Sequence, residues 1–250
     1  MRGAARQWIG SIVFTLYLFV SVALYGIVVL ATAPAPRRVT YRAVLLWVNS
    51  VLVLLRVLCR LDYVVEGQEH LPTENAVLLI KHSSAWETIA QFKVFPEQTW
   101  VIKRELMWAP ILGWILKLLT PIAINRRAGN SAVQQVLEQG ARYLRDGLWV
   151  SIFPEGTRMP PGETRRYGLS GALLAQATGR VIVPVAHNAG DYWPRRGWLK
   201  KPGTIRLVIG PPIPTAGRDA RAINDDAQRW IEATVARIRA GHNAASARAS

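Results

Sequence analysis

The stretch "LLIKHSSAWETIA", residues 78–90, decides the fold class of this chain. It opens as a short apolar run, which is typical of a buried strand, and continues after Ser83 and Ser84 into a segment with helical character. Strands that pass directly into helices are the repeating unit of α/β proteins. A histidine and a carboxylic acid, His82 and Glu87, fall at this junction, where open α/β sheets tend to place their ligands.

The same alternation continues from about residue 61 to residue 240 and predicts an α/β fold with a mostly parallel sheet flanked by helices. No repeat or low-complexity linker divides this region, so we expect one domain over 61–240. The small, polar segment "GHNAASARAS" at 241–250 is expected to be a disordered tail. The predicted strands cover 63–66, 76–81, 99–102, 122–125, 149–153, 181–186 and 204–209, and the predicted helices cover 85–95, 110–119, 131–146, 169–178 and 219–239.

Residues 1–60 carry the strongest apolar signal in the chain. No charged residue lies between Gln7 and Pro36, and residues 9–31 are long enough to cross a hydrocarbon core of about 30 Å as a helix. A secretory signal peptide is the alternative, because "ATA" at 31–33 resembles a cleavage site, but such peptides have apolar cores of only about 7–15 residues. We therefore predict membrane-anchoring helices over 1–60.

A second apolar run at 43–59 is interrupted by Asn49, Ser50 and Arg56. It fits an interfacial helix, the return arm of a hairpin or a helix packed on the domain. The arginines on the two sides of the first run give a small bias toward a main domain on the cytoplasmic face of the membrane. They are Arg2 and Arg6 on one side, and Arg37, Arg38 and Arg42 on the other.

The composition narrows the class of partner. Lysine and arginine outnumber aspartate and glutamate 31 to 16, which predicts attraction to nucleic acid, anionic lipid or an acidic protein. Ten tryptophans favour the lipid surface, because this side chain prefers the membrane–water boundary. The lone Cys59 excludes an internal disulfide framework and a cysteine-rich metal site.

His82 and Glu87 can be interpreted in two ways. Ser84 and Glu87 fit the S-x-x-E capping box, in which the glutamate reaches back to a backbone N–H. Alternatively, His82 takes a proton from a hydroxyl while Glu87 orients the ring and stabilises the imidazolium. The chain contains no G-x-S-x-G elbow, so we expect the nucleophile to be a hydroxyl of the substrate rather than a serine of the protein.

Two further stretches end predicted strands with arginines. "VSIFPEGTRMPPG" brings Glu155 and Arg158 to the sheet edge of His82, although a type II turn with Gly156 at positive φ explains its proline and glycine equally well. "PIAINRR" ends with Arg126 and Arg127. Guanidinium groups bind phosphate through paired hydrogen bonds, so these arginines suggest a phosphorylated substrate. Taken singly, each arginine also fits a solvated surface charge.

The stretch "VIVPVAHNAG" places Pro184 inside an apolar strand, where proline needs an edge, a bulge or a special reason. His187 fits a hydrogen-bonded loop residue. A metal site built from His82, Glu87 and His187 lacks the tight spacing of a zinc motif, so no metal site is expected.

The four stretches, in this order, resemble the four blocks of the glycerolipid acyltransferase superfamily, and within it most closely the bacterial 1-acyl-sn-glycerol-3-phosphate acyltransferases. The resemblance covers about residues 63–214, and "FPEGTR" is its most specific block. It implies that His82 deprotonates the sn-2 hydroxyl of lysophosphatidic acid and that Glu87 orients His82. The family usually has aspartate where this chain has Glu87, which is one methylene longer. The residues that the resemblance implies for acceptor binding are Arg126, Glu155, Gly156, Thr157 and Arg158.

The resemblance also implies the partners. They are lysophosphatidic acid, an acyl-CoA or acyl carrier protein thioester as co-substrate, and membrane lipids, with no cofactor and no nucleic acid. Another lysophospholipid or an aminolipid is the alternative acceptor. A noncatalytic basic membrane protein that binds nucleic acid or anionic lipid is the alternative from another class.

Overall fold

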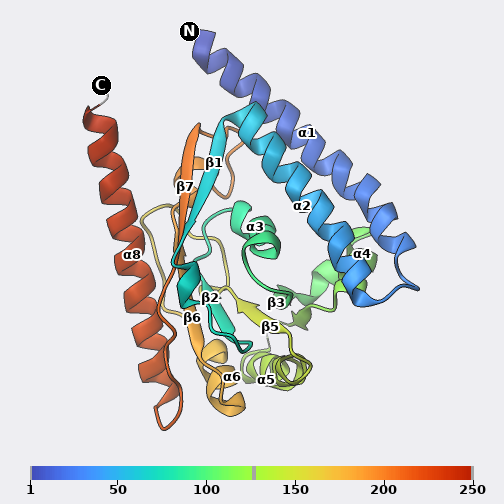
Figure 1. The fold of residues 1–250 in the computed structure, drawn as a ribbon, viewed down its shortest axis with the longest axis vertical. Helices are drawn as coiled ribbons and strands as arrows, with labels where there is room; N and C mark the ends of the chain where they lie inside the picture. Colours follow the sequence, from blue (N-terminus) through green and yellow to red (C-terminus); the bar gives the residue numbers. More distant parts are fainter. Residues whose placement is uncertain (1, 126–127, 249–250) are drawn as a thin grey trace.

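The computed structural model describes residues 2–125 and 128–248, with side chains for 3–125 and 128–241. Its core is one seven-stranded sheet, covered by helices on both faces (Figure 1). The strands are β1 (Leu61–Glu66), β2 (Val77–Ile80), β3 (Gln98–Lys103), β4 (Ile122–Ile124), β5 (Trp149–Ile152), β6 (Ile182–His187) and β7 (Gly203–Ile209). The helices are α1 (Arg2–Ala31), α2 (Arg37–Cys59), η1 (Gln68–His70), α3 (Trp86–Val94), η2 (Arg104–Trp108), α4 (Leu112–Leu119), α5 (Asn130–Arg145), α6 (Ser170–Thr178), α7 (Ala189–Tyr192) and α8 (Ala220–Arg248).

The strands lie in the order β1-β7-β6-β2-β5-β3-β4. Every described pairing is parallel except the one between β6 and β7, so the predicted mostly parallel sheet is confirmed. The central strands β2, β5 and β6 are buried along their whole length, which explains their largely apolar sequences. Because β2, β3, β4, β5 and β6 run in one direction, their carboxyl ends meet at one edge of the sheet.

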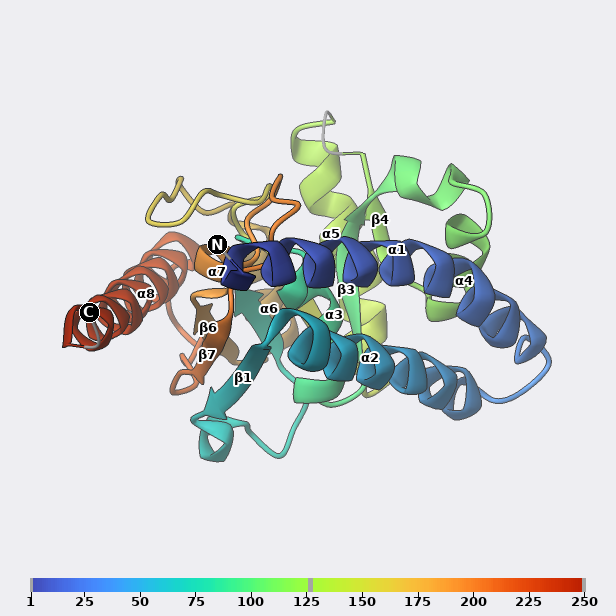
Figure 2. The same ribbon diagram turned by 90° about the horizontal axis from the view of Figure 1, so that it is seen from above.

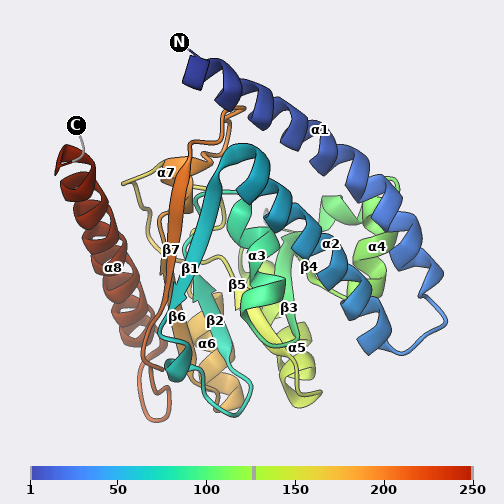
Figure 3. The same ribbon diagram turned by 45° about the horizontal axis from the view of Figure 1, so that its top comes forward.

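Two apolar cores cover the two faces of the sheet. One face packs on α2, α3 and α4, and the other on α5, α6 and α8 (Figure 3). Helix α5 buries Val136, Gly140, Tyr143 and Leu144, a spacing that puts one face of a helix against the sheet. Seven predicted strands and five predicted helices therefore correspond to observed elements, with differences mainly at their ends.

Helices α1 and α2 form an antiparallel hairpin that crosses the top of the domain (Figure 2). Both are long and apolar enough to cross a membrane. Helix α2 is the return arm of the hairpin and is also packed on the domain, since it buries Val48, Val51, Leu55 and other residues of the same face. Two of the three predicted alternatives for the second apolar run, the return arm of a hairpin and a helix packed on the domain, are therefore both correct.

Pro184 lies in the interior strand β6, at the point where the regular pairing of β6 with β7 ends. The missing N–H of proline therefore interrupts no regular ladder on that side. Its carbonyl oxygen accepts a hydrogen bond from the N–H of Gly210 at 2.8 Å, just beyond the last paired residue of β7. The following Pro211 and Pro212 interrupt pairing until Ile213 bridges to Ile182. Proline is tolerated here because the ladder on that side is already broken.

Helix α8 continues to Arg248, whereas the sequence predicted a helix end near residue 239 followed by a disordered tail. The segment 240–248 contains four alanines, and alanine has the highest helix propensity. Its small, polar character therefore did not prevent continuation of the helix.

Candidate active site

The candidate site lies at the carboxyl edge of the sheet, around the end of β2. Strand β2 runs between β6 and β5. His82 follows β2, Glu155 follows β5, and His187 ends β6. Three of the four sequence stretches therefore meet on adjacent strands, while the stretch at 121–127 contains β4, three positions from β2 in the sheet.

The imidazole of His82 and the carboxylate of Glu87 are in direct contact. His82 Nδ1–H donates to Glu87 Oε1 at 2.9 Å, so the proton of the neutral ring is placed on Nδ1 and Nε2 is left as a basic lone pair. The same Oε1 accepts the backbone N–H groups of Ser83 at 2.9 Å and Ser84 at 2.8 Å. The glutamate thus reaches back as in a capping box and orients the histidine with one oxygen, so the two interpretations of Glu87 are compatible.

Glu87 is held as a buried carboxylate. Burial alone would raise its pKa, but the hydrogen bonds that it accepts from the ring of His82 and from the N–H of Ser84 outweigh burial and lower the pKa of Glu87 below its ordinary value. Its second oxygen, Oε2, has no hydrogen-bond partner among the described residues and lies 3.8 Å from His187 Nε2.

His187 is a fixed, neutral ring behind this pair. Its Nδ1 accepts the N–H of Ala189 at 3.2 Å, so Nε2 carries the proton and donates to the carbonyl oxygen of Lys81 at 2.7 Å. Burial lowers the pKa of His187. The predicted hydrogen-bonded role of His187 is confirmed, although the residue ends a strand rather than lying in a loop.

Packing and backbone contacts also fix His82. Its ring stacks on Phe153 with centroids 4.3 Å apart, and its side chain is only 12% exposed. Its N–H donates to Glu155 Oε2 at 2.8 Å, and its carbonyl oxygen accepts the N–H of Met159 at 2.8 Å. The segment after β5 therefore holds both backbone groups of His82.

Glu155 lies inside the protein rather than facing a ligand. Its side chain is fully buried, with Oε1 bound to Lys81 Nζ at 2.8 Å and Oε2 bound to the His82 N–H. Burial raises the pKa of Glu155, while the Lys81 ammonium opposes this shift. This placement differs from the prediction that Glu155 contacts the acceptor, because both of its oxygens are already used within the fold.

Gly156 occupies the last position of a tight turn. Its N–H donates to the carbonyl oxygen of Phe153 at 2.9 Å, and its φ is 65°. The positive φ predicted for Gly156 is therefore confirmed, and the observed hydrogen bond shows that Gly156 also closes the turn over residues 153–156.

Thr157 and Arg158 follow this turn and are half-buried. Arg158 precedes Met159, which is bonded to His82, and its guanidinium makes no ion pair with any described residue. Its backbone carbonyl accepts a hydrogen bond from Arg195 at 3.4 Å. Arg126 and Arg127, predicted from the stretch after β4, lie outside the described residues.

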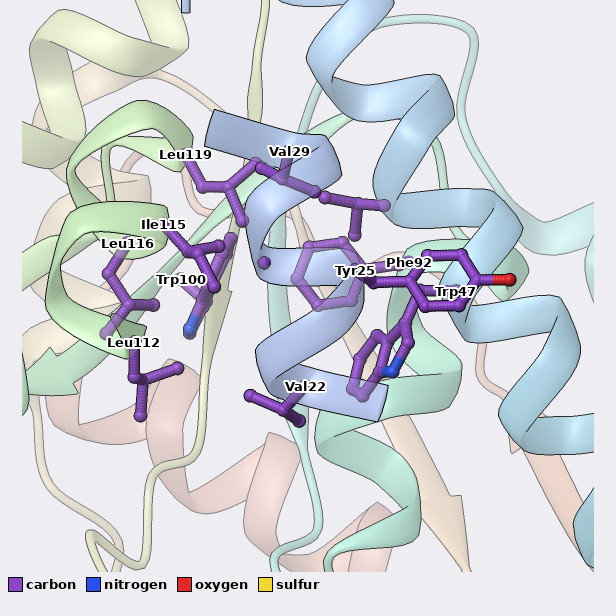
Figure 4. A pocket seen from close by; sticks show the side chains of 12 residues that line it. Val22, Tyr25, Val29, Trp47, Phe92, Trp100, Leu112, Ile115, Leu116 and Leu119 are labelled. Atoms are coloured by element: carbon purple, nitrogen blue, oxygen red, sulfur yellow. The ribbon is translucent and has the colours of Figure 1, made fainter. Parts of the chain in front are cut away.

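An apolar cavity of about 140 Å³ opens between the helical hairpin and the sheet. Its walls come from α1, α2, α3, α4 and β3, and Figure 4 shows Tyr25, Trp47, Phe92, Trp100 and Ile115 around it. The lining is almost wholly hydrocarbon and aromatic, which suits an alkyl chain and offers nothing to a charged group.

Comparison with known proteins places this geometry in a family. The family model described as Acyltransferase matches residues 62–188, which hold His82, Glu87, Arg158 and His187. The chain belongs to the acyltransferase family. The 1-acyl-sn-glycerol-3-phosphate acyltransferase of Pseudomonas aeruginosa is 42% identical over 237 residues, covering 93% of this chain and 92% of that protein.

More distant relatives agree with this family. Human 1-acyl-sn-glycerol-3-phosphate acyltransferase beta is 28% identical over 65% of this chain and 60% of its own length. The crystal structure of the 1-acyl-sn-glycerophosphate acyltransferase of Thermotoga maritima superposes with a TM-score of 0.79 at 22% identity, covering 96% of this chain and 98% of that one. This acyltransferase thus shares its whole fold, hairpin included, with a solved structure.

Two residues at the site of this acyltransferase were not anticipated from the sequence. Lys81, read only as the end of a strand, binds Glu155 beneath the histidine. Glu232, read only as part of a helix, binds Lys81 from α8. A lysine is unusual at the end of a buried apolar strand, and this was the one local signal for the pair.

Proposed function

We propose that this chain transfers a fatty acyl group from a thioester donor to the sn-2 hydroxyl of 1-acyl-glycerol 3-phosphate, giving phosphatidic acid. The observation that carries the proposal is the contact of 2.9 Å between His82 Nδ1 and Glu87 Oε1, which leaves Nε2 as the base. The names of the relatives from Pseudomonas aeruginosa and humans support this choice of acceptor.

In the proposed reaction His82 Nε2 takes the proton of the acceptor hydroxyl as its oxygen attacks the thioester carbonyl carbon. A tetrahedral intermediate forms, and Glu87 stabilises the imidazolium that exists at this stage. The carbon–sulfur bond then breaks, and the leaving thiolate takes the proton back from Nε2. His82 is neutral again, and no atom of the protein has been acylated.

Arg158 is assigned to the acceptor phosphate. It lies one residue from the hydrogen bond that joins Met159 to His82, and none of the described acidic residues pairs with its guanidinium. Arg126 is assigned the same role from the resemblance alone. Glu155 and Gly156 act by shaping the turn that presents Thr157 and Arg158.

We propose that the chain works on one face of a membrane, with α1 lying along the surface. Near its start, Gln7 donates to the carbonyl oxygens of Cys59 and Lys200, and near its end Gly26 lies against Ile115 of α4. A helix attached to the domain along its length cannot cross the bilayer away from it. Its outer side exposes apolar residues from one end to the other, among them Trp8, Ile12, Leu16, Phe19, Leu24 and Ile27.

The test is an assay of washed membranes with lysophosphatidic acid and either acyl-CoA or acyl carrier protein thioester, scored for phosphatidic acid. We expect transfer by the parent and a loss of about 10²–10⁴-fold in kcat for His82→Ala, the range of general acid–base catalysis. His70→Ala, which removes a ring whose hydrogen bond within the described residues is to the Ile209 carbonyl, is the matched control and should keep parent activity. A His82→Ala protein with parent kcat would end the proposal.

Acceptor comparison separates the remaining alternatives. Transfer to a lysophospholipid with a larger head group or to an aminolipid, but not to lysophosphatidic acid, would replace the acceptor and leave the reaction class intact. Lipid binding without transfer to any acceptor would support a noncatalytic membrane protein instead.

A further inference from the structure

A buried ammonium lies directly behind the candidate base. Lys81 is the residue before His82, and only 3% of its side chain is exposed. Its Nζ donates to Glu155 Oε1 at 2.8 Å, to Glu232 Oε1 at 2.9 Å and to the carbonyl oxygen of Glu163 at 3.0 Å. One cation therefore joins the end of β2, the turn after β5, the loop that follows and the last helix.

Glu232 holds this loop as well as the lysine. Its Oε1 also accepts hydrogen bonds from Tyr167 Oη at 2.7 Å and Thr164 Oγ1 at 3.0 Å. Both partners lie in the segment 159–167, which continues from Arg158 and includes Met159, the partner of the His82 carbonyl. Helix α8 thus reaches the site through one carboxylate, from outside the region matched by the family.

The charges explain why the two carboxylates need the lysine. Glu155 is fully buried, and a buried carboxylate without a compensating charge is strongly disfavoured. As a carboxylate, Glu155 accepts the His82 N–H with one oxygen and the Lys81 ammonium with the other. Loss of the ammonium would favour the protonated acid and weaken its hold on His82.

We infer that Lys81 and Glu232 are positioning residues for acyl transfer, and that they form a clamp which fixes the backbone of His82 through Glu155 and the loop of Arg158 through Thr164 and Tyr167. The inference rests on the proposed function for its kinetic part. It assigns α8 a role in the reaction, beyond covering the sheet. Neither residue touches the reacting atoms, so both act through their neighbours.

The clamp is tested by comparing Glu232→Ala and Glu232→Gln. Alanine removes every contact with Lys81, Thr164 and Tyr167, whereas glutamine keeps one oxygen that can accept their hydrogen bonds. Asp226→Ala is the matched control, because Asp226 lies on the same helix and forms ion pairs with Arg218 and Arg229 away from the site. All are measured as full-length protein in the same membranes.

We expect Glu232→Ala to lower kcat/KM for lysophosphatidic acid by about tenfold or more, with a raised KM for this acceptor, as for loss of charge-assisted hydrogen bonds. Glu232→Gln should stay within about threefold of the parent, since neutral hydrogen bonds remain. Asp226→Ala should keep parent kcat and KM even where it lowers Tm. A purely structural role would lower Tm without raising KM, and that result for Glu232→Ala would overturn the inference.

Limited trypsin digestion gives a readout that needs no activity. Arg158, Arg165 and Arg166 are cleavage sites within or beside the clamped loop. Their cleavage should be faster in Glu232→Ala than in the parent and unchanged in Asp226→Ala. Equal cleavage in parent and Glu232→Ala would overturn the clamp. If the parent acylates no lysophosphatidic acid, the proposed function is wrong. The digestion rates of the parent and Glu232→Ala would still decide whether the clamp exists.

Discussion

At the residue scale, one oxygen atom of Glu87 serves both the local backbone structure and the proposed chemistry. Glu87 Oε1 accepts hydrogen bonds from two backbone N–H groups and from the ring of His82. The backbone groups fix the carboxylate before any substrate binds, and the carboxylate in turn fixes the tautomer of the histidine. The longer side chain of glutamate, compared with the aspartate usual in the family, still reaches this position.

Glu87→Gln tests the charge at this atom. The amide oxygen can accept the same hydrogen bonds, but it cannot stabilise an imidazolium as a carboxylate does, so kcat should fall by about 10²-fold. Glu69→Gln, an exposed position, is the control and should leave kcat unchanged. Parent kcat in the Glu87→Gln enzyme would show that the charge is not needed.

The same substitution carries a pH prediction. The pKa of Glu87 is lowered in the folded protein, so its carboxylate stabilises the fold fully above the unfolded pKa of about 4.3, and this stabilisation is lost as pH falls through the lower folded value. Tm of the parent should therefore drop more steeply below pH ~4.3 than Tm of Glu87→Gln. Parallel curves for the two proteins would contradict the lowered pKa.

Contacts between residues that are close in the sequence could be predicted, whereas contacts between residues far apart in the sequence could not. His82 and Glu87 are five positions apart, and the strand-to-helix junction fixes their relation. Lys81 and Glu232 are 151 positions apart, and no local pattern connects them. The inward direction of Glu155 was missed for the same reason, since its partner Lys81 lies 74 positions earlier.

At the scale of elements, apolar patterns in the sequence predicted where the strands lie. They did not predict that β7 runs antiparallel to β6. Strands β2, β5 and β6 are largely apolar runs, and the pairings of β2 with β5 and β6 and of β5 with β3 are parallel as expected. The antiparallel pairing of β7 with β6 depends on the route of the chain through α7 and the loop after it. The sequences of the two strands do not indicate this route.

The close approach of α1 to α2 beside Leu58 requires glycine at position 10. A Cβ built at Gly10 would lie 2.1 Å from the carbonyl oxygen of Leu58, whereas a Cβ at Gly3 would meet nothing within 4 Å. At a helix position with free space around it, replacing glycine by alanine raises the free energy of unfolding by about 1 kcal/mol. Gly3→Ala should therefore keep or raise Tm in detergent, and Gly10→Ala should lower it.

The opposite signs of the two glycine substitutions make them controls for each other. Equal changes in Tm would mean that α1 and α2 do not approach each other closely at Gly10. A larger loss for Gly10→Leu than for Gly10→Ala is expected, because the backbone of Leu58 cannot move aside as a side chain can.

At the scale of the whole molecule, the hairpin of α1 and α2 and the candidate site are joined through the loop before β7. Ser84, whose N–H binds Glu87, donates its hydroxyl to the carbonyl oxygen of Trp193 at 2.6 Å. The Trp193 ring meets Phe14 of α1 edge-to-face with centroids 5.4 Å apart. A hairpin attached in this way also supports the loop that carries the proposed base.

Single cysteines at the two ends of α1 test its placement in the membrane. The only cysteine, the buried Cys59, is first replaced by alanine, and Gly3→Cys and Ala33→Cys are then made separately, with Glu69→Cys marking the side of the catalytic domain. Because α1 is attached to the domain near both ends, a membrane-impermeant maleimide should label all three from the same side of sealed vesicles. Labelling of position 3 from the side opposite to positions 33 and 69 would mean that α1 crosses the bilayer, which would require it to leave the contacts of Gln7 with Cys59 and Lys200.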